Sequence, residues 1–134
     1  MSKHNGMKGA ELAQFQAELR QFCGTENWYR HPLNPRLVYT DGVQYLAEKA
    51  GAYWLIDVVA SVQHTEPQLA RHSFQSWKLT VDAEKATGLV ACTDGNNTAL
   101  YSQRIEYTDF PLPEIKLYCC ADGKRHVLML TSEY

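Results

Sequence analysis

Four polar side chains are spaced to form one stripe on a predicted helix, and they are the residues best placed to do chemistry. At positions i, i+4, i+8 and i+11, the stripe consists of Tyr53, Asp57, Ser61 and His64. A hydroxyl flanked by a carboxylate and an imidazole suggests nucleophilic hydrolysis. The order argues against a triad, because a triad histidine lies between nucleophile and acid, whereas Asp57 and His64 are about 10 Å apart along a helix axis.

Asp57 is the member of this stripe that we expect to be most informative about function. It lies in the otherwise apolar run from Trp54 to Val59, where a carboxylate needs a polar partner. The partner that we expect is a tyrosine hydroxyl, an arginine or a group on another subunit.

A second set of candidate binding residues lies in an irregular segment upstream. Residues 25–35 contain two prolines and two asparagines, which exclude regular structure over most of the segment. Its candidate contact residues are Trp28, Tyr29, Arg30 and His31. We favour the interpretation that these aromatic residues fold back onto the core; a binding loop held by a rigid scaffold is the alternative.

Other catalytic and metal chemistry has little support in the sequence. Cys23 is predicted to end a helix, where the dipole disfavours a thiolate that His31 could activate, so we expect a buried structural cysteine. His64 and His72 with Cys119 or Cys120 lack the spacing of structural zinc sites, so no metal is predicted. No cofactor is predicted either, since the chain has no glycine-rich phosphate loop, HExxH or GxSxG motif.

Composition and charge limit the class of protein. The chain has 134 residues and a net charge of −2, which fits one globular domain and does not favour nucleic-acid binding. The N-terminus has no apolar signal region and no run is long enough to span a membrane, so we expect a cytoplasmic protein without membrane contact. Its four cysteines, none in a CxxC pair, are then expected to be reduced and mostly buried.

Helices are predicted in the first half of the chain from apolar residues at helical spacing. Residues 1–8 are predicted to be a flexible tail, and a helix follows over residues 9–22, ended by Gly24. Asp41 is predicted to cap a second helix that Gly51 ends. Residues 52–64 form a third, since only a helix separates the polar stripe from the apolar positions, and a short helical turn precedes Ala70.

Strands are predicted in the second half, in a single domain over residues 1–134. Apolar and polar residues alternate from Trp77 to Asp82, and further strands are expected at 89–93, 99–108, 115–121 and 126–130. Turn residues at 94–97 and 122–124 indicate hairpins. We therefore predict an α+β domain whose helices cover one face of a four- to five-stranded antiparallel meander.

The aromatic content indicates an interface. Tyrosine and tryptophan are frequent at protein interfaces and in ligand pockets. Tyr101 and Tyr107 are expected to lie on an exposed face of the sheet, which a second copy of the chain would cover. The sequence therefore predicts a homodimer that forms through this face or through an edge strand.

Several short blocks along most of the chain resemble a family of small bacterial proteins of unknown function, often carried on plasmids, phages or integron gene cassettes. The most specific are Gly24-Thr25-Glu26, Tyr29-Arg30-His31, Tyr39-Thr40-Asp41-Gly42, the helix from Tyr45, and Ala52 to Asp57. Consistent with them are Asp94-Gly95, Phe110-Pro111-Leu112 and Ser132-Glu133-Tyr134. The resemblance implies origin on a mobile element and a bacterial cytoplasmic setting, and it implies no activity, cofactor or catalytic residue.

We therefore expect a non-enzymatic accessory module, acting as a dimer, that binds a protein partner or a small ligand through the Trp28–His31 loop and the Asp57 stripe. The alternative is a small hydrolase or transferase that uses Asp57 and His64 as acid–base groups, with Arg30 holding an anion. A pocket that unites Arg30, His31, Asp57 and His64 would favour the enzyme. An internally paired Asp57 beside a flat aromatic face would favour the module.

Overall fold

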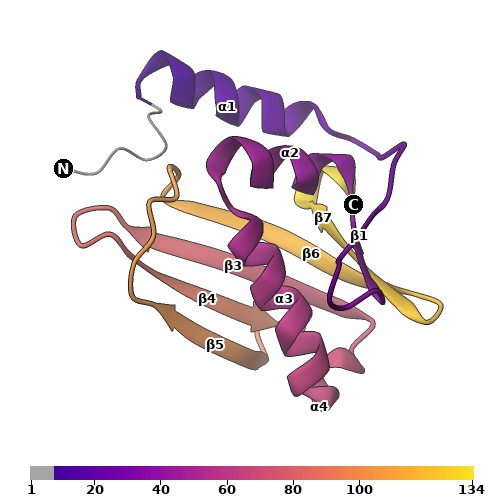
Figure 1. Ribbon diagram of the computed structural model, residues 1–134. Coiled ribbons are helices and arrows are strands. Elements are labelled where there is room, and N and C mark those ends of the chain that lie inside the picture. The colour runs from indigo at the N-terminus through magenta and orange to yellow at the C-terminus, as the bar shows by residue number, and fades with distance from the viewer. Residues whose placement is uncertain (1–7) are drawn as a thin grey trace.

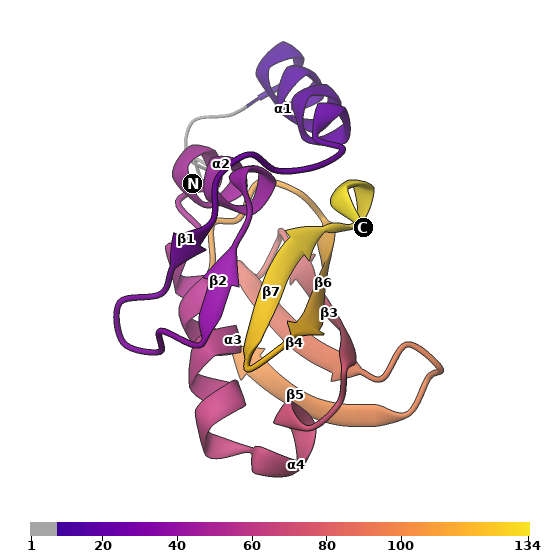
Figure 2. The ribbon, with the colours of Figure 1, turned by 90° about the vertical axis from the view of Figure 1, so that its right-hand side faces the viewer.

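Helices and strands separate into two layers in residues 8–134, which are the residues that the computed structural model describes (Figures 1 and 2). The α-helices of this part of the chain are α1 (Ala10–Gln21), α2 (Asp41–Ala50), α3 (Tyr53–Thr65) and α4 (Pro67–Ala70). α3 lies across one face of the sheet, and α1 packs on α2 through Phe15 and Tyr45, whose ring centroids are 6.0 Å apart. The predicted α+β class is confirmed. The predicted tail, apart from Lys8, lies outside the described residues.

The described strands form one sheet with the order β1-β2-β7-β6-β3-β4-β5. β2 and β7 are parallel neighbours, and the other neighbouring pairs are antiparallel. In chain order the strands are β1 (Tyr29–Arg30), β2 (Leu37–Tyr39), β3 (Phe74–Asp82), β4 (Thr87–Thr93), β5 (Ala99–Ile105), β6 (Glu114–Asp122) and β7 (Arg125–Leu130).

The predicted meander of four or five antiparallel strands is wrong in two respects. The described sheet has seven strands: the short extended segment Leu37–Tyr39 joins it as β2, and β1, which is only two residues long and shows no alternation in the sequence, joins it at the edge. β6 pairs with β3 and not with β5, because residues 106–113 carry the chain back to the far side of β3. Phe110 and Leu112 are buried in that connection, and the Pro113 carbonyl accepts a hydrogen bond from Val81 N.

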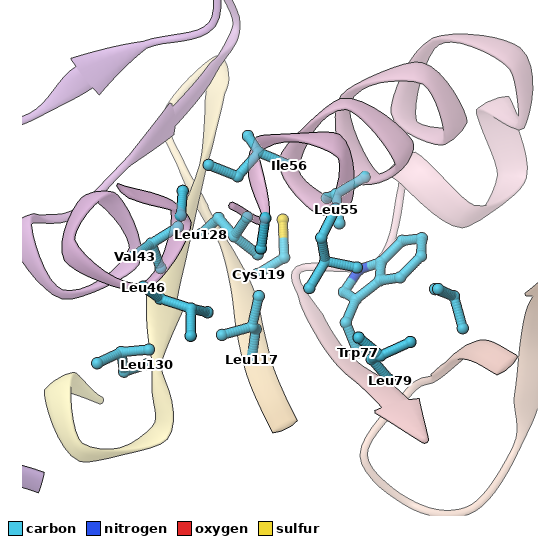
Figure 3. Close-up of a cluster of buried hydrophobic side chains, with 14 of the residues drawn as sticks. Val43, Leu46, Leu55, Ile56, Trp77, Leu79, Leu117, Cys119, Leu128 and Leu130 are labelled. Atoms are coloured by element: carbon cyan, nitrogen blue, oxygen red, sulfur yellow. The ribbon is translucent and has the colours of Figure 1, made fainter. Parts of the chain in front are cut away.

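The core lies between the helices and the inner face of the sheet (Figure 3). The buried side chains labelled there are Val43, Leu46, Leu55, Ile56, Trp77, Leu79, Leu117, Cys119, Leu128 and Leu130. One buried amide, that of Gln75, exchanges hydrogen bonds of 2.6 and 3.0 Å with the Gln63 amide and accepts a third from Trp77 Nε1. This satisfied polar pair holds α3 against β3.

The ends of α2 show one prediction confirmed and one corrected. Gly51 ends the helix in the left-handed conformation, at φ 62°, as its position predicted. The N-cap is Thr40 and not Asp41: the Thr40 hydroxyl accepts from Val43 N at 3.3 Å. The end of α1 also differs, since Phe22 occupies the C-cap and Gly24 lies beyond it.

Asp41 instead fastens the preceding loop to the start of α2. Its carboxylate accepts hydrogen bonds from Glu26 N at 2.9 Å, from Asn27 N and Nδ2, and from the Tyr29 hydroxyl. These bonds, led by that of the Glu26 amide, lower the pKa of Asp41 to about 2. The ionised carboxylate is therefore the form that holds this loop.

The pH dependence of this contact can be tested with Asp41→Asn. Because the folded-state pKa lies below the unfolded value, about 3.9, the stabilisation is present above about pH 4 and is lost as the pH falls toward 2. We expect Asp41→Asn to melt below the wild type at neutral pH and to match it near pH 2, as measured by thermal unfolding. Glu106→Gln, at an exposed carboxylate, is the control. A gap in melting temperature that does not change with pH would contradict this assignment.

The C-terminus is held by a contact that we call the Glu133 clamp, formed by Thr40, Gly42, Leu130 and Glu133. A 3₁₀ helix (Thr131–Glu133) follows β7 and brings the Glu133 carboxylate to the N-terminus of α2. Glu133 Oε1 accepts from the Thr40 hydroxyl at 2.6 Å and from Leu130 N at 2.9 Å, and Oε2 accepts from Gly42 N at 3.1 Å. Sequence blocks 91 residues apart, Thr40-Asp41-Gly42 and Ser132-Glu133, are therefore in direct contact.

Two predictions about single side chains are corrected. Tyr101 lies on the inner face of the sheet, where its ring centroid is 6.2 Å from that of the buried Trp77, while Tyr107 follows the end of β5 and is 70% exposed. Cys23 is exposed because α1 ends before it, whereas Cys92 and Cys119 are buried as expected.

Within the described residues, no helix is both long and apolar enough to cross a membrane.

Candidate functional site

The His31 ring is the centre of the most organised polar site in the described structure. Its Nδ1 accepts hydrogen bonds from Leu33 N at 3.1 Å and Asn34 N at 3.0 Å, and its Nε2 lies 2.8 Å from Asp57 Oδ1. Since backbone amides can only donate, Nδ1 is unprotonated and the proton lies on Nε2, which donates to Asp57. The ring is buried, with 5% of the residue exposed.

The segment between β1 and β2, which we call the His31–Arg36 loop, is fixed to α3 at a second point. Asn34 Nδ2 donates to the Ala60 carbonyl at 3.0 Å, and Asn34 Oδ1 accepts from Arg36 N at 3.2 Å. At its base, His31 N donates to Leu37 O at 2.9 Å. The loop is thus built by local turns and by two contacts to one side of α3, so it is preorganised.

A groove of about 740 Å³ lies between this loop and α3. It is lined by His31, Leu33, Asn34, Pro35, Arg36, Asp57, Ala60, Ser61 and His64. Leu33 contributes an apolar wall and is 89% exposed. Cavities of roughly 300–1,000 Å³ hold small molecules in proteins, so the groove has the volume of a small-ligand site.

The groove contains polar side chains that can contact a ligand, but its His31 is not free to act as a general base. Both ring nitrogens of His31 are engaged, so the ring cannot take a proton from a substrate without releasing the loop. In the described structure the side chains of Arg36, Ser61 and His64 make no hydrogen bond or ion pair, which leaves them available to a ligand. Asp57 is 69% exposed, with Oδ1 on His31. Burial, and secondarily the charge of Asp57, raise the pKa of Tyr39.

The structure brings some of the predicted site residues together and separates others. His31, Asp57, Ser61 and His64 line the groove. Within the described chain, Asp57 pairs with His31 rather than with the tyrosine or arginine that the sequence led us to expect. Leu33, Asn34, Pro35, Arg36 and Ala60 were not predicted; two Pro residues flanking Leu33-Asn34 were the only signal of a shaped loop.

The remaining predicted binding residues have structural contacts outside the groove. The Tyr29 ring stacks on Tyr39 with centroids 5.5 Å apart, and the Tyr53 hydroxyl bonds Glu48 at 3.0 Å. The Trp28 ring receives the Arg125 guanidinium at 5.3 Å from its centroid. Arg30 lies in β1 and does not line the groove, so the arginine that lines the groove is Arg36.

Metal-binding geometry is not found in residues 8–134, where no three His, Cys, Asp or Glu side chains gather in a way that could hold an ion. The buried Cys119 and the half-buried Cys120 are neighbours in β6 and face opposite sides of the sheet.

Comparison with known proteins gives a family and no activity. A family model described as a family of unknown function, DUF6876, matches residues 13–134. No curated protein and no solved structure matches the chain. The match begins within α1 and includes the Asp41 contacts, the His31–Arg36 loop, the sheet and the Glu133 clamp. The chain therefore belongs to this family of unknown function, DUF6876.

Proposed function

We propose that this protein is a non-enzymatic binding module whose ligand is a small molecule held in the groove between the His31–Arg36 loop and α3. The observation that carries the proposal is the preorganised loop: His31 and Asn34 hold it on α3, and Arg36, Ser61 and His64 remain free to contact a ligand. Little conformational entropy is then lost on binding, since the walls are already in place.

An enzyme that uses Asp57 and His64 as acid–base groups has less support. One Asp57 oxygen is bonded to His31, and His64 lies seven residues further along α3, about 10 Å along the axis. Arg30, the expected anion holder, is outside the groove. The groove unites His31, Asp57 and His64, as the enzyme alternative requires, but not Arg30, and the internal pairing of Asp57 supports the binding module.

The setting of this function is part of the proposal. The resemblance to proteins of plasmids, phages and integron cassettes supports an accessory role on a mobile element, exercised in the bacterial cytoplasm. The protein acts as a homodimer, with one groove on each copy. A protein partner that inserts a side chain into the groove is the alternative to a small molecule, and Leu33, as an exposed apolar residue beside it, would be the first contact.

A thermal-shift screen with a blocking variant tests the groove. Ligands that bind the native state raise its melting temperature by mass action. We expect hits from a metabolite library on the wild type, and we expect them to be lost in Ser61→Trp, which fills the groove from an exposed position on α3. The matched control is Gln68→Trp, at an exposed position on α4 outside the groove.

Four results would count against the proposal. Hits that survive Ser61→Trp place the ligand elsewhere, and hits lost equally in Gln68→Trp reflect general destabilisation. No hit in the library, together with capture of a partner protein that Leu33→Asp abolishes, replaces the small molecule by a protein. Turnover of any bound compound would restore the enzyme alternative.

A further inference from the structure

β5 (Ala99–Ile105) is the last strand at one edge of the sheet (Figure 1). Six of its seven residues pair with β4, Leu100 being left out at a register irregularity, and no described backbone hydrogen bond reaches its other side from a loop. The opposite edge is β1, which has two residues and is followed at once by His31-Pro32. The sheet therefore has one short edge and one long open edge.

The middle of the open edge has few of the features by which proteins prevent edge pairing. Such protection usually comes from proline, charged side chains, a bulge or a charged residue that points inward. β5 has no proline or lysine, and its register irregularity lies at its start, opposite Cys92 and Thr93. Tyr101, Gln103 and Ile105 share the inner face, and the single charge, Arg104, lies on the outer one. An unprotected edge of this length is expected to pair with another strand.

We propose that the other strand is β5 of a second copy of the same chain, paired antiparallel about a twofold axis at Ser102. This register places Tyr101 opposite Gln103 and Ser102 opposite Ser102, and it brings Arg104 beside Leu100, the extra residue of the irregular pairing with β4. From Tyr101 to Gln103 it keeps inner-face residues beside inner-face residues, so the helices of both copies cover the same side of one continuous sheet. This strand pairing would be the interface of the homodimer proposed above, and the inference rests on that proposal.

The positions of the charged side chains favour pairing through the β5 edge over a dimer in which the outer faces of two sheets stack. In the edge register Arg104 lies opposite the uncharged Leu100, and no like charges oppose each other. The outer face of the sheet instead carries Lys78, Lys116 and Arg104, of which Lys78 is paired with Glu114 at 3.4 Å. Stacking two such faces would bury these charged side chains, which is unfavourable.

The proposed β5–β5 register can be tested by placing a charged residue at its centre, Ser102. Ser102 is exposed, so a lysine or glutamate there is tolerated in the monomer. We expect the wild type to sediment as a dimer, and we expect Ser102→Lys and Ser102→Glu each to raise the dissociation constant by about tenfold or more, because like charges then meet on the axis. Mixing the two variants should restore a dimer that contains one copy of each. In a Cys23→Ser background, Ser102→Cys should form an intermolecular disulfide under mild oxidation.

The control variant is Thr80→Lys, at an exposed position on β3 in the middle of the outer face, and it should leave the dimer intact. A dimer that is lost in Thr80→Lys but kept in Ser102→Lys would overturn edge pairing while leaving the homodimer. A wild type that remains monomeric at all concentrations would overturn both. Unchanged thermal unfolding of each variant at low concentration shows that the fold is retained.

Discussion

Gly42→Ala is expected to lower the free energy of unfolding by about 2 kcal/mol. Alanine in place of glycine within a helix usually stabilises a protein by about 0.5–1 kcal/mol, so the expected sign is reversed here. The reason is the Glu133 clamp: a Cβ at Gly42 would lie 2.6 Å from both Glu133 Oε1 and Leu130 Cδ1. The carboxylate can retreat only by giving up hydrogen bonds to Gly42 N, Leu130 N and the Thr40 hydroxyl.

The measurement is the free energy of unfolding of Gly42→Ala by chemical denaturation, compared with the same substitution at a glycine whose Cβ position is unobstructed. Gly24 has no heavy atom within 4 Å of the position that a Cβ would take, so Gly24→Ala should change stability little. Glu133→Ala should cost about 2 kcal/mol, since it leaves Gly42 N and Leu130 N without their acceptor. The double variant Gly42→Ala/Glu133→Ala should lose less than the sum, because both changes break the same contact. Additive losses would contradict the clamp.

His31→Ala is expected to release the His31–Arg36 loop from α3 and to abolish binding in the groove. It removes the acceptor of the Leu33 and Asn34 amides and the donor to Asp57 in one step, and it leaves a buried site partly empty. We expect a loss of about 2–4 kcal/mol in unfolding free energy. Faster hydrogen exchange at the amides of Leu33 and Asn34 would show that the loss arises in the loop.

Asp57→Asn is the matched control for this variant. The asparagine side-chain oxygen can still accept from His31 Nε2, and because Asp57 is 69% exposed, its charge contributes less than about 1 kcal/mol. Nitrogen chemical shifts of the ring at neutral pH should report the Nε2–H tautomer. The Nδ1–H tautomer, or unchanged exchange in His31→Ala, would refute the arrangement.

The sequence by itself determined the local elements of this protein. Apolar spacing placed the first three helices within a few residues of their observed bounds, and the polar stripe on α3 kept Asp57, Ser61 and His64 on one side, where they line the groove. Gly51 ended α2 as predicted, because a left-handed C-cap depends on the residue itself. Alternation and turn residues likewise predicted β3 to β7, because strand pleat and hairpin turns act over a few residues.

Only the tertiary structure decided which distant groups meet. The partner of Asp57 is 26 residues away in a loop whose prolines hide any periodicity. Arg36 rather than Arg30 reaches the groove because Arg30 lies in β1, a two-residue strand that the sequence did not predict. Asp41 was assigned to the wrong role, since its acceptor capacity is used by amides 14 and 15 residues upstream and Thr40 already caps the helix. Which distant residues come into contact depends on how the loops close and on which face of the sheet the helices cover, and both are properties of the whole chain. Caps, turns and periodicity depend only on neighbouring residues, so they can be predicted from the sequence.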